Sequence, residues 1–289
     1  MCSSDLGDVD ARLARALADP SELVRATAGY VLVHRGNAAG AAEVLKAARS
    51  KDPAVFKLAE TAVLKELVLW DANNKSACAI DPKTPLVPRF PVGKAEAQEL
   101  LGLTDAGSWF LSRAALLMIG QSASPEAAEG LLGRLDRLKD RNLNRAIGAL
   151  GALRCRAAVP RLVEYLARGT PANRNTLEYN GDEAEKYAAR ALAAIGDPAS
   201  VGPLVGLLDS AKPEVRALAL ESLSRLFAGG ETASDRRLMP ADGRLVAVRI
   251  DELPEPSARR AAWEAFWKAS AGRYEWNEGG PGLREKSGK

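Results

Sequence analysis

The residues that could ligate a transition metal or act as nucleophiles are few in this sequence. It has one histidine, His34, and three cysteines, Cys2, Cys78 and Cys155. Zinc and iron sites draw on several Cys and His residues at short spacings, and no such cluster is present. Phosphate-binding Gly-rich loops, nucleophile elbows and recognisable triads are also missing. We therefore expect no metal site, no cofactor and no catalytic residue.

Arginines form the densest group of residues with binding chemistry. Residues 141–180 hold seven arginines and two glutamates, whereas the whole chain carries a net charge of only +3. Guanidinium groups pair with carboxylates or phosphates in a bidentate manner. The alternative is a solvated face on which the arginine stems cover neighbouring helices. The small overall charge argues against a general nucleic-acid surface and favours a local patch.

One predicted helix in this segment offers a candidate partner-binding surface. Its apolar residues Val159, Leu162, Val163 and Leu166 share the face expected to be buried. Exposed Tyr and Arg together are the residue types most enriched at binding hot spots. The predicted partner-binding residues, which include two from the polar loop that follows, are Arg161, Glu164, Tyr165, Arg168, Arg174 and Tyr179. In the next repeat Pro203, Gly206 and Leu207 occupy the matching positions and predict a shallow apolar groove beside this polar ridge.

The elements that position these side chains form an internal repeat. Six segments can be aligned from Val24, Val55, Leu111, Arg145, Tyr187 and Val215. Four residues on, each segment has alanine: Ala28, Ala59, Ala115, Ala149, Ala191 and Ala219. Eight residues on, each has an aliphatic residue: Leu32, Val63, Ile119, Leu153, Ile195 and Leu223. Positions four and eight apart lie on one helical face, and a small residue there lets a neighbouring helix approach closely.

A second helix follows the first in four segments, with leucine 21 residues from the start at Leu45, Leu132, Leu166 and Leu208. Asp-Pro pairs at 19–20, 52–53 and 197–198 place a capping carboxylate before a proline at a predicted helix start. The best-formed stretch, 187–220, closely resembles the short HEAT-like repeats named after phycobilisome bilin lyases. The resemblance covers residues 19–67 and 107–227.

That resemblance implies the fold with good specificity and leaves the function open. The family includes scaffolds, bilin lyases, a metal-dependent hydroxylase and, more remotely, alkylpurine DNA glycosylases. The hydroxylase uses repeated His-Glu pairs, whereas His34 is followed by Arg35 and is expected only to end a helix. The glycosylases use tryptophan and a carboxylate on a basic surface, for which Trp70, Asp71 and Trp109 are the candidates here.

We therefore predict an all-α fold, a right-handed α-solenoid of about six HEAT-like helix pairs in residues 7–227. A loop insertion at 70–93 and a second at 169–182 interrupt it, each either a binding loop or a variable surface loop. Residues 228–271 should form an irregular segment, with a short β-hairpin near 236–250, and then a capping helix that carries Trp263, Phe266 and Trp267. Residues 272–289 are predicted to be a flexible tail, with Tyr274 and Trp276 as the residues that could pack back.

The predicted function is a non-catalytic protein–protein interaction scaffold, active as a monomer. The alternative is a HEAT-like DNA-binding protein or a relative of the alkylpurine DNA glycosylases; nucleic acid and membranes are not the expected partners. Residues 1–6 resemble a translated sequencing adapter, so the natural N-terminus is expected to be missing and a lost signal peptide stays open. The expected location is cytoplasmic, with Cys78 and Cys155 as free thiols there or as one disulfide outside.

Overall fold

The computed structural model describes most of the chain in separate stretches. These are residues 3–35, 37–59, 94–104, 112, 115–116, 118–120, 122, 124–138, 140–168, 184–229 and 235–286. Both predicted insertions, 70–93 and 169–182, lie entirely outside the described residues, as do Trp70, Asp71, Cys78 and Trp109. The chain divides into two compact units, Met1–Leu138 and Lys139–Lys289. The predicted domain boundaries after residues 227 and 271 fall inside the second unit and stay predictions.

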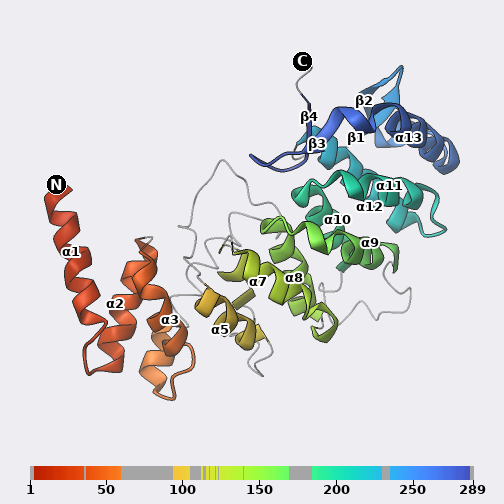
Figure 1. Cartoon of the computed structure of the whole chain (residues 1–289). Coiled ribbons are helices and arrows are strands. Elements are labelled where there is room, and N and C mark those ends of the chain that lie inside the picture. Colours follow the sequence, from red (N-terminus) through yellow and green to blue (C-terminus); the bar gives the residue numbers. More distant parts are fainter. Residues whose placement is uncertain are drawn as a thin grey trace. The chain divides into compact units, whose positions relative to one another are not determined.

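The first unit consists of short helices. They are α1 (Ser3–Ala16), α2 (Glu22–His34), η1 (Ala38–Gly40), α3 (Ala41–Ala47), a helix whose residues 53–59 are described, α5 (Lys94–Thr104), helical residues between 112 and 120, α7 (Pro125–Leu132) and η2 (Leu135–Arg137). Consecutive helices pack together, α1 on α2, α2 on α3 and α5 on α7. Figure 1 shows α1 to α3 in red and orange.

The second unit begins with helix pairs and ends with two small hairpins. Its helices are α8 (Asp140–Ala152), η3 (Arg156–Ala158), α9 (Val159–Arg168), α10 (Ala184–Ile195), η4 (Pro198–Ser200), α11 (Val201–Gly206), η5 (Leu207–Asp209), α12 (Pro213–Ala228), η6 (Ile250–Glu252), α13 (Pro256–Ser270) and η7 (Ala271–Arg273). Its strands are β1 (Arg236–Ala241), β2 (Arg244–Arg249), β3 (Tyr274–Trp276) and β4 (Leu283–Glu285). The all-α fold class and the predicted hairpin near 236–250 are both confirmed.

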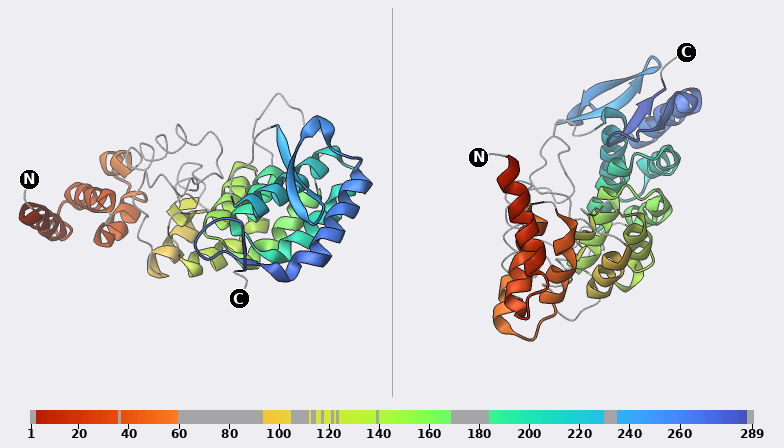
Figure 2. Two further views of the ribbon diagram at one scale, coloured as in Figure 1. Left: turned by 90° about the horizontal axis from the view of Figure 1, so that it is seen from above. Right: turned by 60° about the vertical axis from the view of Figure 1, so that its left-hand side comes forward.

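The helices of the second unit lie in two layers (Figure 2). In the first layer α10 packs against α8 on one side and α12 on the other. In the second layer α9 and α11 follow α8 and α10 in the chain, and α11 packs against α13. α9 packs against α10, and α11 packs against α12, so each of these second-layer helices contacts the first-layer helix that follows it in the chain.

The repeated alanines lie in helix contacts, as predicted. Their six side chains are all buried, with Ala115 and Ala219 fully so. The approach between α8 and α10 is close: a Cβ added to Gly151 would lie 2.8 Å from the Cα and 2.9 Å from the Cβ of Ala191. Real Cβ atoms do not approach other carbons this closely, so the two helices can pack here only with small residues on both sides.

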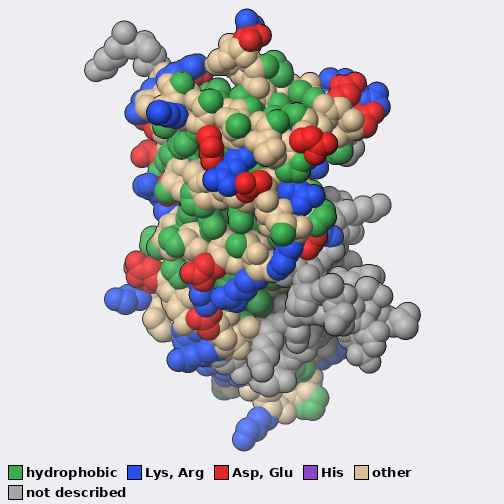
Figure 3. All heavy atoms as spheres, turned by 90° about the vertical axis from the view of Figure 1, so that its right-hand side faces the viewer, with side chains coloured by type: hydrophobic (Ala, Val, Ile, Leu, Met, Phe, Trp, Pro, Cys, Tyr) green, Lys and Arg blue, Asp and Glu red, His purple; other side chains and the backbone are tan. Residues whose placement is uncertain are grey.

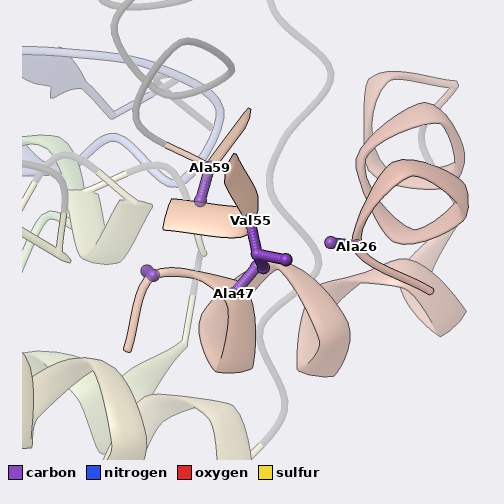
Figure 4. Close-up of a cluster of buried hydrophobic side chains, with 5 residues drawn as sticks. Ala26, Ala47, Val55 and Ala59 are labelled. Atoms are coloured by element: carbon purple, nitrogen blue, oxygen red, sulfur yellow. The ribbon is translucent and has the colours of Figure 1, made fainter. Parts of the chain in front are cut away.

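The core of the first unit is also built from closely packed small residues. Ala26 of α2, Ala47 and Ala48 at the end of α3, and Val55 and Ala59 of the next helix form one buried cluster. Figure 4 shows Val55 pointing toward Ala47, with Ala26 facing the cluster from α2. Four of these five residues are alanines, whose side chains occupy little volume. The helix backbones must therefore lie close together for the cluster to be well packed.

Some predicted positions differ by about one residue from the observed core. Leu132 is half-buried, because the side chains that point inward from α7 and η2 are those of Leu131 and Leu135. Leu153 is also half-buried, since α8 ends one residue before it. Val24 is exposed at the start of α2. A 3₁₀ turn follows several of these helices, and it has fewer residues per turn than an α-helix. Later residues therefore point in a direction that a fixed spacing of 21 residues does not predict.

The Asp-Pro pairs cap as predicted in two of three cases. Asp52 accepts a hydrogen bond from the backbone N–H of Ala54 at 2.8 Å, and Asp197 accepts one from Ala199 at 2.9 Å. Asp19 instead accepts from Ser21 at 2.8 Å, and α2 begins at Glu22. His34 is the last residue of α2, where we expected it.

The C-terminal helix covers the end of the helix layers. Trp263 and Phe266 of α13 are buried and Trp267 is half-buried, consistent with the predicted capping helix. Their rings surround Phe227 near the end of α12, with centroids 5.4 Å away for Trp263 and 5.7 Å for Phe266. Several large rings thus pack together where the small-residue repeat ends. Among the described residues no helix is both long and apolar enough to cross a membrane.

The contact between α8 and α10 gives a direct test of the packing. Ala191→Leu should lower the free energy of unfolding by about 1–3 kcal/mol, because the added atoms have no room beside Gly151. Denaturant unfolding of the full chain measures this change. The control is Ala265→Leu on the exposed face of α13, which should stay within about 0.5 kcal/mol of the parent. Equal stability of both variants would mean that α8 and α10 are not in close contact.

Candidate partner-binding surface

Helix α9 presents one apolar and one charged face to its surroundings. Val159, Leu162 and Leu166 are buried against the first layer. The exposed residues on the opposite side include Glu164 and Arg168, and Arg161 is half-buried. This is the 3.6-residue periodicity of a helix packed on one side only.

Tyr165 does not lie on the accessible face, which corrects our prediction. Its side chain is only 8% exposed. The Cζ atoms of Arg161 and Arg168 lie 5.5 Å and 4.9 Å from the centroid of its ring. The tyrosine stands between the apolar and charged faces, and a ring with a polar tip is often buried at such a boundary. It therefore supports the two arginines and contributes little surface of its own.

Glu164 links the two arginines on the surface. Arg161 donates a hydrogen bond to its carboxylate, and the guanidinium of Arg168 lies 3.8 Å from the same oxygen. The spacings of three and four residues put all three side chains on one side of the helix. Arg161, Glu164 and Arg168 are thus brought together as predicted. Their role in binding stays a prediction, and Arg174 and Tyr179 lie outside the described residues.

Helix α11 carries almost no side chain on its exposed side. Gly202, Pro203 and Gly206 are exposed, whereas Val201, Leu204 and Val205 are buried. A Cβ added to Gly202 or Gly206 would have no other atom within 4 Å, so these glycines do not serve internal packing. Lys212, which follows η5, donates a hydrogen bond to the backbone carbonyl of Arg168 and ties this repeat to the end of α9. We call Arg161, Glu164, Arg168, Gly202, Pro203 and Gly206 the α9–α11 surface.

Sequence reasoning counted the two arginines of the turn between α8 and α9 in the basic patch but missed what they contact. Arg154 has a left-handed backbone (φ 52°), and its guanidinium donates to the carbonyl of Ile195 at 3.2 Å and that of Glu278 at 3.1 Å. The Cζ atoms of Arg154 and Arg156 lie 4.7 Å and 5.4 Å from the centroid of the Trp276 ring. The indole N–H of Trp276 donates to the carbonyl of Ile195 at 2.8 Å. A residue of the C-terminal hairpin is therefore held at this turn.

The hairpin docks closely along the ends of the first-layer helices. The segment predicted as a flexible tail pairs Tyr274–Trp276 with Leu283–Glu285. The N–H of Gly282 donates to the carbonyl of Ala193 at 3.3 Å. A Cβ added to Gly196 would lie 2.3 Å from the carbonyl oxygen of Gly282, and both glycines have positive φ. Only glycine at both positions permits this backbone approach.

These contacts shift the pKa values of Arg154 and Arg156 and occupy their guanidinium groups. Arg156 donates to Asp197 at 2.6 Å, a hydrogen bond that raises the pKa of the guanidinium. Burial lowers the pKa of Arg154. Both stay protonated, because arginine titrates far above physiological pH. Two of the seven arginines that suggested a basic patch are therefore committed to internal contacts, and Asp197 neutralises one of them.

Comparison with known families agrees with this architecture. The family model of the PBS lyase HEAT-like repeat matches residues 144–168 and 186–210. These two stretches are PBS lyase HEAT-like repeats. The first HEAT-like repeat contains most of α8 and all of α9, and the second contains most of α10, all of α11 and η5. The α9–α11 surface is thus made by the second helices of two neighbouring HEAT-like repeats.

Solved structures resemble the chain at the level of the fold. Human deoxyhypusine hydroxylase in complex with glycerol is 20% identical, with 75% of this chain and 83% of that one covered and a TM-score of 0.38. The complex of CpcE and CpcF of phycocyanin lyase from Nostoc sp. PCC7120 is 17% identical over 74% and 76%, with a TM-score of 0.37. A designed armadillo repeat protein in complex with the peptide (KR)4 is 16% identical over 74% and 98%, with a TM-score of 0.37. Likenesses this remote carry no argument about function. A search of curated protein sequences finds no significant match.

The Trp276 contacts can be measured by a double-mutant cycle. Trp276→Ala should destabilise the chain by about 1–2 kcal/mol, since it removes two cation–π contacts and leaves the Ile195 carbonyl with one donor fewer. Arg154→Ala should show a coupling of about 0.5–1 kcal/mol with it. Unfolding of both single variants and the double variant gives the coupling. Lys268→Ala, on the exposed face of α13, is the control. A coupling of zero would show that Arg154 and Trp276 are not in contact.

Proposed function

We propose that this chain is a non-catalytic scaffold that binds a partner protein on the α9–α11 surface. The observation that carries the proposal is that two arginines of α9 lie over the buried ring of Tyr165, while α11, the matching helix of the next HEAT-like repeat, exposes Gly202, Pro203 and Gly206. Such a surface has both parts of a protein interface, an anchored polar rim and an apolar strip that a partner can approach closely.

The arginines are well suited to directed hydrogen bonds. Arg161 and Arg168 contact the Tyr165 ring and the Glu164 carboxylate, so both long side chains are held near one position before a partner arrives. Ordering an arginine on binding costs about 0.5–1.5 kcal/mol of side-chain entropy. A side chain that is already held loses less, and its guanidinium can still donate to a partner carboxylate or carbonyl.

The strip on α11 suits an approaching backbone or apolar side chain. With Gly202 and Gly206 exposed and Pro203 between them, a partner element can come within contact distance of the helix itself. The arginine and glutamate of α9 border one side of this strip. On the other side Arg260 of α13 pairs with Asp209 at 2.6 Å and with Glu264 at 2.7 Å. Charged groups around a small-residue centre resemble the rim and core of known interfaces.

The charge distribution argues against a nucleic-acid surface. Basic and acidic side chains are interspersed on the face shown in Figure 3 and do not form a region of one sign. Glu164 lies between Arg161 and Arg168, and Asp197 binds Arg156. A phosphate backbone requires several uncompensated cations in a row. We therefore favour a protein partner over DNA.

Charge reversal on α9 tests the proposed surface. Arg161→Glu together with Arg168→Glu should abolish capture of the partner from extract of the native cell, because both donors are lost and like charges surround Glu164. The melting midpoint should fall only slightly, since like-charge pairs on a helix cost about 0.2–0.5 kcal/mol each. Quantitative mass spectrometry of the captured proteins provides the measurement.

The matched control reverses two cations elsewhere. Lys268→Glu with Arg15→Glu changes the net charge equally at exposed positions of α13 and α1, and it should retain the partner. If the α9 variant remains folded and captures the same partner to the same extent, the binding surface lies elsewhere on the chain.

Binding to duplex DNA separates the scaffold from the alternative. At about 0.15 M salt we expect no detectable binding of a fluorescein-labelled 20-base-pair duplex in anisotropy measurements. A nucleic-acid binder would instead show affinity that falls steeply as salt is raised, because each neutralised phosphate releases counterion. The result that would contradict the scaffold is tight, salt-dependent DNA binding that is lost in the variant with both Arg161→Glu and Arg168→Glu. It would assign DNA, and not a protein, as the ligand of the same surface.

A further inference from the structure

In the part of the chain that the structure describes, strand β2 has one edge without a partner strand. The N–H of Ile250 donates to the carbonyl of Asp235 at 2.9 Å, and the pairs from Arg236↔Arg249 to Ala241↔Arg244 follow toward the turn. Hydrogen-bonded pairs alternate along an antiparallel ladder. Val248, Val246 and Arg244 therefore direct their backbone groups toward β1. Leu245, Ala247 and Arg249 direct theirs away from it.

The corresponding edge of β1 is already closed. Its outward-facing backbone positions are Arg236, Leu238 and Pro240 by the same alternation. The N–H of Leu238 donates to the hydroxyl of Ser224 on α12 at 2.9 Å, and Pro240 has no N–H. β1 packs against α12 and α13, with Met239 buried beneath it. The open edge of the hairpin is therefore that of β2 alone.

β2 is apolar in its centre and has an arginine at each end, of which Arg249 is paired with Asp251 at 3.0 Å. Between Arg244 and Arg249 stand four apolar residues, Leu245, Val246, Ala247 and Val248. Val246 is 36% exposed and Ile250, just beyond the strand, is 46% exposed. Proteins usually protect an exposed edge with a charge or a proline in its middle. Here the middle carries neither, and a two-stranded hairpin gains stability from a third strand.

We propose that the free edge of β2 binds an extended segment of a partner protein as a third, antiparallel strand, and that this segment has an apolar centre and an acidic residue at the end that lies beside Arg244. Backbone groups of Leu245, Ala247 and Arg249 would pair with it, as in other cases of β-strand addition. The exposed guanidinium of Arg244, which has no ion pair with a described residue, recognises one terminal carboxylate. The proposal is independent of the α9–α11 surface.

The test uses a substitution that closes the edge without breaking the hairpin. Ala247→Pro removes an outward N–H, as Pro240 already does in β1, and leaves every bond between β1 and β2 in place. Ala247→Thr keeps the N–H and a strand-forming side chain, so it is the matched control. The probe is a labelled, end-capped peptide Glu-Thr-Val-Thr-Val-Glu, with Lys-Thr-Val-Thr-Val-Lys as its charge-reversed counterpart. Binding to the full chain is followed by fluorescence anisotropy.

We expect the acidic peptide to bind the parent chain at least tenfold more tightly than the basic one. Ala247→Pro should weaken this binding at least tenfold while far-UV circular dichroism stays unchanged, and Ala247→Thr should stay within about twofold. Arg244→Glu should remove the preference for the acidic peptide. Arg161→Glu with Arg168→Glu should have no effect here, which separates this result from that of the α9–α11 surface.

Three outcomes would overturn the proposal. They are no binding of the acidic peptide to the parent chain, equal binding by the Ala247→Pro variant, and equal binding of the two peptides. Sedimentation of the chain without peptide supplies a further check. A dimer that Ala247→Pro converts to monomer would assign the edge to a second copy of the chain in place of a partner segment.

Discussion

The closeness of first-layer helices is the constraint on which the rest of the second unit depends. Between α8 and α10 the contact of Gly151 with Ala191 brings two helix backbones together with no space for another carbon atom. Each such contact sets the distance from one repeat to the next. The spacing of α9 and α11 follows from it, because each of these helices returns from its own first-layer partner. The position of Gly196 against Gly282 depends on the same spacing.

The repeat itself could be predicted because its signal is local. Alanine at one position and an aliphatic residue four later are properties of a single helix, and every such alanine is buried. The two HEAT-like stretches at 144–168 and 186–210 lie inside the region of the resemblance. The leucine predicted 21 residues after the start of a repeat is buried at Leu45, Leu166 and Leu208. At Leu132 the prediction is wrong, because the buried side chains there are those of Leu131 and Leu135.

The candidate site was less predictable, for two physical reasons. Tyr165 lies at the border of the helix face, where a difference of a few degrees decides between exposure and burial. The contacts of Arg154 and Arg156 with Trp276 join residues about 120 positions apart. No periodicity indicates such a pair. The sequence signal for the docked hairpin was the pair Gly196 and Gly282, because glycine allows two backbones to approach closely. Each of these glycines is explained equally well by a turn, so neither one alone indicates the contact.

The docked hairpin also bears on the order in which the chain becomes structured. The contacts of the helix pairs join elements of the same or adjacent repeats, and contacts of short sequence separation form earlier than distant ones. The bond from Arg154 to Glu278 spans 124 residues and requires α8, α10 and Trp276 to be in place. During synthesis the strands β3 and β4 emerge after every helix they contact. The ends of α8 and α10 therefore stay uncovered until residues 274–285 have been synthesised, and a nascent chain is the form in which a chaperone or protease would meet them.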